Sequence, residues 1–412
     1  MSFEEFHRPL PSLSKIVRDF GTTYAVNGFV GFIFAASGPV AIILTMGTRG
    51  GLDQMQLSSW LFGAFFLNSL LTIVFCILYR NPLVFFWTIP GTVLVGAALD
   101  HISFPEIIGA YIVTGVLMAV LGLSGWVRRA MNVIPMPIVM AMVAGVFLQF
   151  GLDLVFAFRD GFTIAAPMCG VFVLLSCFSK IGRLLPPLIG ALIVGVLTIL
   201  ITNGYQPVNN AQLTITIPTI VYPEFTLAAI VELVVPLAIT VIVVQNGQGF
   251  AILKAARFDP PINAITIACG AVSIVASFTG TVSTCLTGPV NAMVSASGEH
   301  HRQYTAGLFV AVLGLLFGVF SSYFTSIMLA TPPEFIATLA GLAMLRVLQN
   351  SMNTAFGGSC TLGALVTFLV TLANVPIFSL GAPFWGLVIG CATSFILERG
   401  EYQQAISTDV TG

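Results

Sequence analysis

The residues best suited to bind a ligand lie at breaks in otherwise apolar sequence. The first break, Thr-Ile-Pro-Gly at 88–91, interrupts an apolar and aromatic stretch at 81–99. Pro90 lacks a backbone donor and disfavours the α conformation at Ile89, which predicts an extended segment up to Trp87 followed by a helix. The start of that helix would present unpaired N–H groups and a positive dipole end, which together bind anions. The alternative is an ordinary helix kinked at Pro90, with no ligand.

A second segment has the same form. The stretch 281–291 reads TVSTCLTGPVN, and its Thr287-Gly-Pro aligns with Thr88-Ile-Pro at an offset of 199. Another pair of similar fragments, 137–145 and 333–341, has an offset of 196, so the register is ambiguous by one helical turn. If the two half-helices meet end to end, their N-termini would converge on one anion site near the middle of the membrane.

Two further polar breaks are expected beside this site. Ser37-Gly38-Pro39 interrupts one apolar run, and Gln245-Asn246-Gly247-Gln248-Gly249 interrupts another. Amide groups are costly against lipid, so these breaks should face protein or a polar cavity. Close packing of a neighbouring helix on the glycines is the alternative.

These segments together predict a site made of N–H, hydroxyl and amide groups without a side-chain cation. Such a site suits a small carboxylate better than a bare cation. Phe85 and Trp87 are expected on one face of the extended segment, where an aromatic anion would stack, or where the rings would simply pack. The predicted substrate-binding residues are Ser37, Gly38, Phe85, Trp87, Thr88, Gly91, Gln245, Asn246, Ser283, Thr284, Thr287 and Asn291.

Glu232 is the acidic residue that lies clearly within a predicted span. An intramembrane carboxylate is a functional candidate, and we predict that Glu232 couples a proton, with a place at the outer interface as the alternative. The seven cysteines form no Cys-x-x-Cys pair, and no nucleotide-binding or hydrolase motif is present. We therefore predict no metal, no cofactor and no enzymatic activity.

The elements that position these residues are membrane helices. The chain has 412 residues, 57% hydrophobic and 8% charged, whereas soluble domains carry about 25% charged residues. Its mean hydropathy is +1.01. An all-α polytopic membrane protein is predicted, with fourteen segments in two inverted repeats of seven. The apolar runs are 21–47, 57–79, 82–99, 106–126, 134–151, 162–179, 184–202, 225–252, 261–278, 282–297, 304–329, 334–350, 359–373 and 377–397.

Loop charges predict the orientation. With the N-terminus inside, the outer segments hold only Arg49 and Arg159, and thirteen Lys and Arg fall inside, which places both termini in the cytoplasm. The inner residues are Arg8, Lys15, Arg18, Arg80, Arg128, Arg129, Lys180, Arg183, Lys254, Arg257, Arg302, Arg346 and Arg399. The predicted parts are a cytoplasmic segment 1–20, a first repeat 21–202, an extracytoplasmic linker 203–224, a second repeat 225–397 and a cytoplasmic tail 398–412.

Three motifs resemble one transporter family. They are the Trp-Thr-Ile-Pro-Gly break at 87–91 after Asn81-Pro82, Gln245-Asn246 leading into Ala-Ile-Leu-Lys at 251–254, and Gly-Glu-His at 298–300. They resemble the BenE-type benzoate/proton symporters, which are similar in fold to nucleobase/ascorbate and sulfate permeases. Cys285 and Gly288-Pro289 depart from the family pattern.

The resemblance implies a core domain at 21–126 plus 225–329 and a gate domain at 134–202 plus 334–397. Substrate would lie near Thr88 and Thr284, and gate-domain surfaces often pair in this fold, so a homodimer is among the expected partners. We predict a secondary transporter of the inner (plasma) membrane that moves a small organic anion, an aromatic carboxylate such as benzoate, by proton symport with alternating access. An anion channel or uniporter of the same fold and a nucleobase permease are the alternatives, and no nucleic acid is an expected partner.

Overall fold

The computed structural model describes residues 4, 10–127, 134–177, 185–202, 213–373, 375 and 382–408. Five residues from the loop-charge count, Arg8, Arg128, Arg129, Lys180 and Arg183, lie outside this part. The same holds for most of 1–9, for 203–212 of the predicted linker and for 409–412 of the predicted tail.

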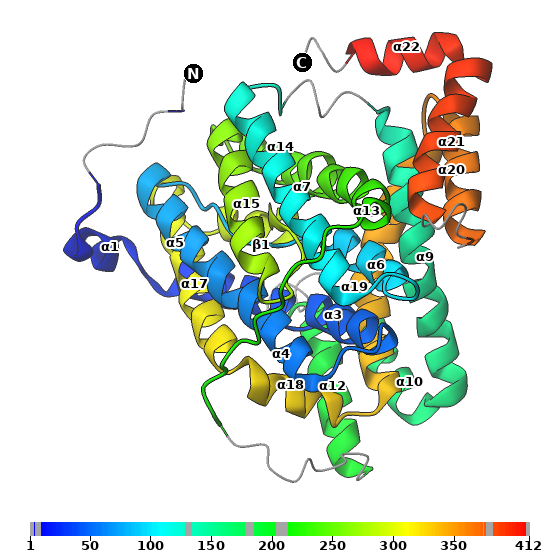
Figure 1. Cartoon of the computed structure of the whole chain (residues 1–412). Coiled ribbons are helices and arrows are strands. Elements are labelled where there is room, and N and C mark those ends of the chain that lie inside the picture. The colour runs from blue at the N-terminus through cyan, green and yellow to red at the C-terminus, as the bar shows by residue number, and fades with distance from the viewer. Residues whose placement is uncertain are drawn as a thin grey trace.

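The chain is helical over most of its described length (Figure 1). Its first half comprises α1 (Leu13–Asp19), α2 (Thr22–Ala36), α3 (Gly38–Arg49), α4 (Gln54–Phe62), the π-helix η1 (Gly63–Leu67), α5 (Asn68–Tyr79), β1 (Phe85–Trp87), α6 (Ile89–Ala98), α7 (Phe104–Ser124), α9 (Met136–Asp160), α10 (Phe162–Cys177) and α12 (Pro187–Ile201).

The second half repeats several of these features. It comprises α13 (Leu227–Ile239), the π-helix η2 (Thr240–Asn246), α14 (Gly247–Ala255), α15 (Ile262–Ser277), β2 (Thr284–Leu286), α16 (Gly288–Ser295), the 3-10 helix η3 (His300–Arg302), α17 (Tyr304–Val319), α18 (Ser321–Leu329), α19 (Pro333–Phe356), α20 (Thr361–Ala373), α21 (Ala382–Leu397) and α22 (Arg399–Thr408).

Seven helices within the described residues are long and apolar enough to cross a membrane, and several shorter apolar helices accompany them. The chain is therefore an integral membrane protein. The count of fourteen segments and the inverted repeat stay predictions. One predicted run, 304–329, is divided in the structure, because α17 ends at Val319 and α18 begins at Ser321.

The strand and half-helix predicted around Pro90 are present. β1 runs through Trp87, and α6 begins at Ile89 with Pro90 in its first turn, where the missing N–H is tolerated. A kinked continuous helix is thereby excluded. The break predicted after the first apolar helix also occurs, because α2 ends at Ala36, and Ser37, with φ −102° and ψ −97°, separates it from α3.

β1 and β2 form a two-stranded antiparallel sheet near the centre of the molecule, with Trp87 opposite Thr284 (Figure 1). Each strand is followed at once by a helix. β1 and β2 begin at Phe85 and Thr284, and 284 − 85 = 199, so these two units correspond at the offset of 199 and not at 196. The pairing brings the N-termini of α6 and α16 to opposite ends of the same short ladder.

The break expected at 245–249 takes another form. Helical structure continues from α13 through η2 into α14, and the irregularity is the π-helix η2, which begins at Thr240 and follows Pro236 inside α13. A π-helix inserts an extra residue per turn without ending the helix, and such distortions are frequent at functional sites. The predicted break in the helix at 245–249 is therefore wrong. The structure has a π-helical distortion in a continuous helix, and it begins at Thr240, about one turn before the predicted position.

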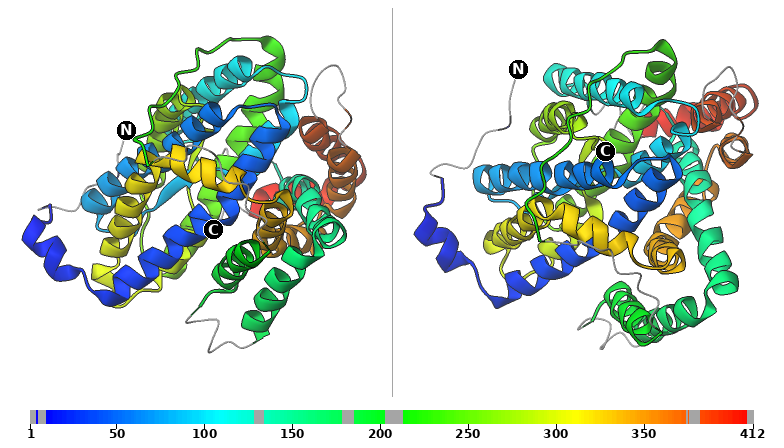
Figure 2. Two further views of the ribbon diagram at one scale, coloured as in Figure 1. Left: turned by 90° about the horizontal axis from the view of Figure 1, so that it is seen from below. Right: turned by 60° about the horizontal axis from the view of Figure 1, so that its bottom comes forward.

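The buried side chains form two large clusters. One lies among α2, α3, α4, η1, β1, α6, α7, α13, α16 and α17, and the other among α3, α6, α9, α10, α12 and α19. In both views of Figure 2, α9, α19, α20 and α21 stand to one side of the helices around α4, α5 and α17. The α3 helix contributes to both clusters and so connects the two groups of helices.

The segment 213–226 crosses one face of the molecule in extended conformation. Thr216 N–H donates to Val319 O, Val221 N–H to Phe278 O, and Glu224 N–H to Pro105 O. It thus ties together the ends of α17 and α15 and the start of α7. We call this face the linker side.

Candidate functional site

The strand pair fixes the two helix starts that were predicted to bind an anion. Beyond the strands, Thr88 N–H donates to Ser283 O at 3.0 Å, and Thr287 N–H donates to Val84 O at 3.1 Å. Thr88 is 0% exposed and Thr287 is 6% exposed. Both N-cap residues are therefore held by the backbone of the other strand segment, inside the protein.

The two helix starts are capped differently. The Thr88 hydroxyl accepts a hydrogen bond from Gly91 N–H at 3.2 Å and donates one to Thr240 Oγ1 at 3.2 Å. The Thr287 side chain makes no capping hydrogen bond at α16. The first turn of α16 accordingly retains more of its capacity to bind an anion than the first turn of α6.

Three of the predicted polar residues support the strands. Asn246 Oδ1 accepts from Leu286 N–H at 2.7 Å, and Asn291 accepts from Val84 N–H at 2.9 Å while donating to Val84 O at 3.1 Å. Thr284 donates to Asn68 Oδ1 at 2.8 Å. Asn68, at the start of α5, is a buried contributor that sequence reasoning missed, because nothing near it in the chain signals its partner.

Two of the predicted residues carry buried polar atoms without a hydrogen-bond partner among the described residues. They are Ser283 Oγ and Trp87 Nε1, each adjoining the strand pair. Buried donors are almost always satisfied by protein, water or ligand. We call the strand pair together with the starts of α6 and α16 the junction. These two atoms lie beside the junction and can bind a polar molecule.

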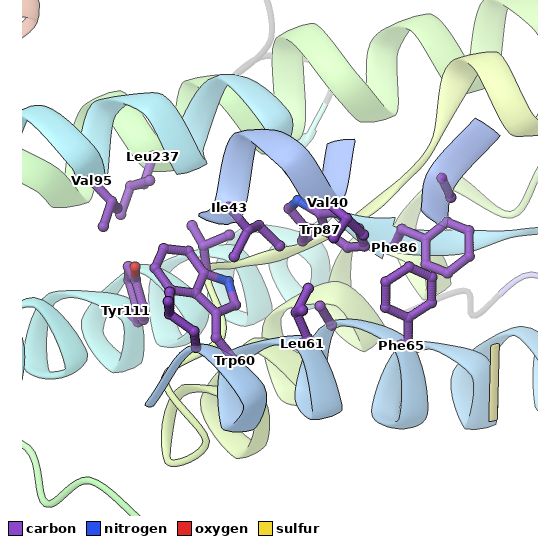
Figure 3. Packing of buried hydrophobic residues seen from close by; sticks show 14 of the residues in the cluster. Val40, Ile43, Trp60, Leu61, Phe65, Phe86, Trp87, Val95, Tyr111 and Leu237 are labelled. Atoms are coloured by element: carbon purple, nitrogen blue, oxygen red, sulfur yellow. The ribbon is translucent and has the colours of Figure 1, made fainter. Parts of the chain in front are cut away.

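The aromatic residues of β1 do not share one face. Phe85 packs edge-on against Phe75, with ring centroids 5.0 Å apart. Phe86 and Trp87 both contact Phe65, at 5.3 and 5.2 Å, in the cluster shown in Figure 3. The expectation that Phe85 and Trp87 lie on one face is wrong, because strand alternation ends where β1 turns into α6. Trp87 is 2% exposed.

The remaining predicted residues lie on α3, α6 and η2. Ser37 donates to Phe34 O at 3.1 Å, and Gly38 packs closely on Ala343 of α19. A Cβ at Gly91 would lie 3.0 Å from Leu237. Gln245 is 5% exposed.

Glu232 is buried, at 4% exposure, and its Oε2 lies 3.1 Å from His101 Nε2. The pair lines a cavity of about 230 Å³ between the end of α6, α13 and the start of α21, together with Asp100 and Pro236. His101 was missed in the sequence, because it follows α6 in a short loop and its partner is 131 residues away.

A second cavity adjoins the first. It has a volume of about 170 Å³, lies between α3, α6, α9 and α20, and shares Asp100 and Pro383 with the first cavity. Arg49 lines it and forms a 2.8 Å ion pair with Asp153 of α9. Both cavities separate segments predicted as core from segments predicted as gate, beside the second half of α6.

Comparisons with known sequences show the family to which this chain belongs. Residues 19–396 match the model of a family described as benzoate membrane transport protein (BenE). The chain belongs to this family. It is 30% identical over 385 residues to the inner membrane protein YdcO of Escherichia coli, covering 91% of this chain and 97% of YdcO. It is 27% identical to the benzoate membrane transport protein of Acinetobacter baylyi, covering 94% of this chain and 98% of that relative.

Solved structures show the same fold. The transmembrane domain of the cyanobacterium bicarbonate transporter BicA superimposes with a TM-score of 0.61 at 14% identity, covering 88% of this chain and 96% of that domain. The anion transporter family member SLC26A9 gives 0.62 at 15% identity, covering 93% of this chain and 67% of that protein. Membership of a membrane transport family identifies the chain as a membrane transport protein.

Proposed function

We propose that the protein is a secondary transporter of the inner membrane that carries a small aromatic carboxylate, such as benzoate, together with a proton. The observation that carries the proposal is the strand pair. It places the N-termini of α6 and α16 at opposite ends of one buried three-residue ladder, and Trp87 Nε1 and Ser283 Oγ, which have no hydrogen-bond partner among the described residues, lie at the α6 end. Helix N-termini and neutral donors favour an anion.

The substrate class is supported by the family and by the residues around the junction. A relative that aligns over 98% of its length is named a benzoate transporter. Trp87, between Phe65 and Phe86, supplies an aromatic wall, although packing alone would also explain these contacts. We propose the predicted residues at 37–38, 85–91, 245–246 and 283–291 as the substrate site, with Asn246, Thr284 and Asn291 positioning the strands.

The transport cycle follows from the two groups of helices. We propose segments 21–126 and 225–329 as a core that moves against a gate of 134–202 and 334–397, so that the junction is exposed to the two sides in turn. Glu232 carries the coupled proton in this proposal, and both termini lie in the cytoplasm. A pairing of gate surfaces into a homodimer completes the proposed assembly.

The test measures the uptake of three labelled compounds, benzoate, bicarbonate and uracil, into proteoliposomes. Each compound is measured with and without an inward proton gradient. We expect accumulation of benzoate that requires the gradient. Equilibration of benzoate that ignores the gradient would favour a channel or uniporter of the same fold. Accumulation of uracil alone would replace the proposal with a nucleobase permease.

A further inference from the structure

Polar side chains join α6 to the helix α13–η2 at both ends of α6. At the start of α6, the Thr88 hydroxyl lies 3.2 Å from Thr240 Oγ1. Beyond its other end, His101 Nε2 lies 3.1 Å from Glu232 Oε2. Glu232 and Thr240 are eight residues apart, about 12 Å along the helix, and the hydrogen bonds show that both side chains reach the α6 segment. The buried junction and the His101–Glu232 pair are therefore the two ends of one α6–α13 contact.

The two side chains of the pair differ in their exposure to water. The His101 side chain is 29% exposed and the Glu232 side chain is 4% exposed. His101 lies four residues before Pro105, whose carbonyl binds the extended segment 213–226, and so belongs to a loop that adjoins the linker side. The imidazole is thus the outer member of the pair, and the carboxylate is the inner member.

The charges around the pair favour a proton over an anion. Asp100 lines the same cavity, and α21 contributes only Ala382, Pro383 and Phe384 to it. Arg49 lines the adjoining cavity and is bound to Asp153 of α9. On α7, Glu106 is bound by the backbone and hydroxyl of Ser103. His101 therefore contacts the Glu232 carboxylate and shares its cavity with Asp100, and among the described residues that line this cavity there is no Lys or Arg.

We propose that His101 and Glu232 are the proton-loading site of the transporter on its linker side. This inference rests on the proposed proton symport. It adds His101 as a second residue that carries the proton, and the linker side as the side from which the proton enters. His101 Nδ1 takes a proton from a hydronium ion of the outside solution, which becomes water, while its Nε2–H proton passes to Glu232 Oε2; this leaves a neutral imidazole and a neutral carboxylic acid. A neutral acid is far less costly to bury than a carboxylate, so protonation favours closure of α21 over the pair.

The experiment compares two kinds of transport by purified full-length protein in proteoliposomes. One is benzoate accumulation driven by a one-unit inward proton gradient, which supports about tenfold accumulation in one-to-one symport. The other is counterflow of labelled against unlabelled benzoate without a gradient, which needs no net proton release. The variant is His101→Gln, and the matched control is His300→Gln, because His300 stacks on Phe258 away from this cavity.

We expect His101→Gln to keep counterflow, to lose nearly all of the gradient-driven accumulation and to have a flat pH profile, and His300→Gln to behave as the wild type. Unchanged accumulation and pH profile in His101→Gln would overturn the inference alone. Loss of counterflow as well, in a variant that unfolds at the wild-type temperature, would assign the pair to the scaffold and overturn the inference too.

If His101→Gln does not fold, Glu232→Gln, which retains a partner for the imidazole, gives the same comparison. Wild-type protein that never couples benzoate to protons would overturn the proposed function itself, and this inference with it.

Discussion

At the scale of single residues, the neighbouring amides Gln245 and Asn246 have different surroundings. Asn246 is 0% exposed, and its Oδ1 accepts the N–H of Leu286 in β2 at 2.7 Å. Gln245 is 5% exposed on the π-helix η2. The same amide chemistry therefore supports a strand in one case and is proposed to bind substrate in the other.

We predict that substitutions separate these roles. Asn246→Ala should lower the free energy of unfolding by about 1–3 kcal/mol, because the buried Leu286 N–H loses its acceptor. Gln245→Leu should abolish benzoate uptake and change stability by less than about 1 kcal/mol. Unfolding in detergent and uptake into vesicles measure the two effects. Wild-type uptake by Gln245→Leu would remove Gln245 from the site, and wild-type stability of Asn246→Ala would mean that Leu286 finds another acceptor.

Local chemistry decides which site residues a sequence can reveal. Pro90 and Thr88 were predictable, because the missing N–H of Pro90 and the preference of Thr for N-cap positions act on adjacent residues. His101 and Asn68 were not, because their partners Glu232 and Thr284 lie 131 and 216 residues away. A polar residue in a loop or at a helix start has no local signal for such a contact.

At the scale of elements, the strand–helix units were predictable and the π-helices were not. The positions of Pro90 and Pro289 each mark the start of a helix after an extended segment. The π-helix η1 begins at Gly63, which packs closely on Thr279 and Thr281. This contact joins residues more than 200 positions apart, and no pattern of apolar residues in 57–79 shows it.

The C-terminal helices offer a pH-dependent prediction at this scale. Glu398 accepts hydrogen bonds from Leu362 N–H, Gly363 N–H and the Ser394 hydroxyl, at 2.8, 3.0 and 2.6 Å, and so caps the start of α20. Burial raises the pKa of Glu398, but these hydrogen bonds outweigh burial and hold its pKa below the usual value of 4.5. Because the folded-state pKa is lowered, the cap stabilises the protein above the unfolded-state pKa and is lost as the pH falls through the folded-state pKa.

Glu398→Gln should therefore reduce stability at pH 7 by about 1 kcal/mol, as the loss of a helix cap does. The difference from the wild type should shrink as the pH falls through the lowered folded-state pKa of Glu398, below which both side chains are neutral. Denaturant unfolding in detergent at pH 7 and at acidic pH measures it. A difference that stays constant with pH would show that the charge of Glu398 does not contribute.

At the scale of the whole molecule, the contact between the proposed core and gate includes the Arg49–Asp153 ion pair. Arg49 of α3 and Asp153 of α9 are 2.8 Å apart, with side chains 50% and 13% exposed. An exposed pair contributes only about 0.2–1 kcal/mol, which shifts a two-state equilibrium by no more than about fivefold. Arg49 cannot by itself hold the two groups together.

Accordingly, Arg49→Gln should change the rate of benzoate uptake by less than about fivefold, and the effect should shrink at high salt. The exchanged pair Arg49→Asp with Asp153→Arg should recover most of the lost rate. Initial uptake rates at low and high salt give the comparison. A larger loss that the exchange does not repair would place Arg49 in substrate binding instead of in the contact between helices.

A close contact between the proposed core and gate is at Gly38, where α3 begins against α19. A Cβ added at Gly38 would overlap the Cβ of Ala343, which is buried in the second cluster. Crowding of this kind costs about 1–3 kcal/mol, so Gly38→Ala should depopulate the closed arrangement about tenfold and slow uptake to a similar extent.

Ala343→Gly removes the methyl group that the new side chain meets. The double variant Gly38→Ala with Ala343→Gly should therefore transport faster than Gly38→Ala alone, and a double-mutant cycle on initial uptake rates measures the coupling. Strictly additive effects would mean that α3 and α19 do not approach each other during transport, and the proposed movement of core against gate would then need a different closing contact.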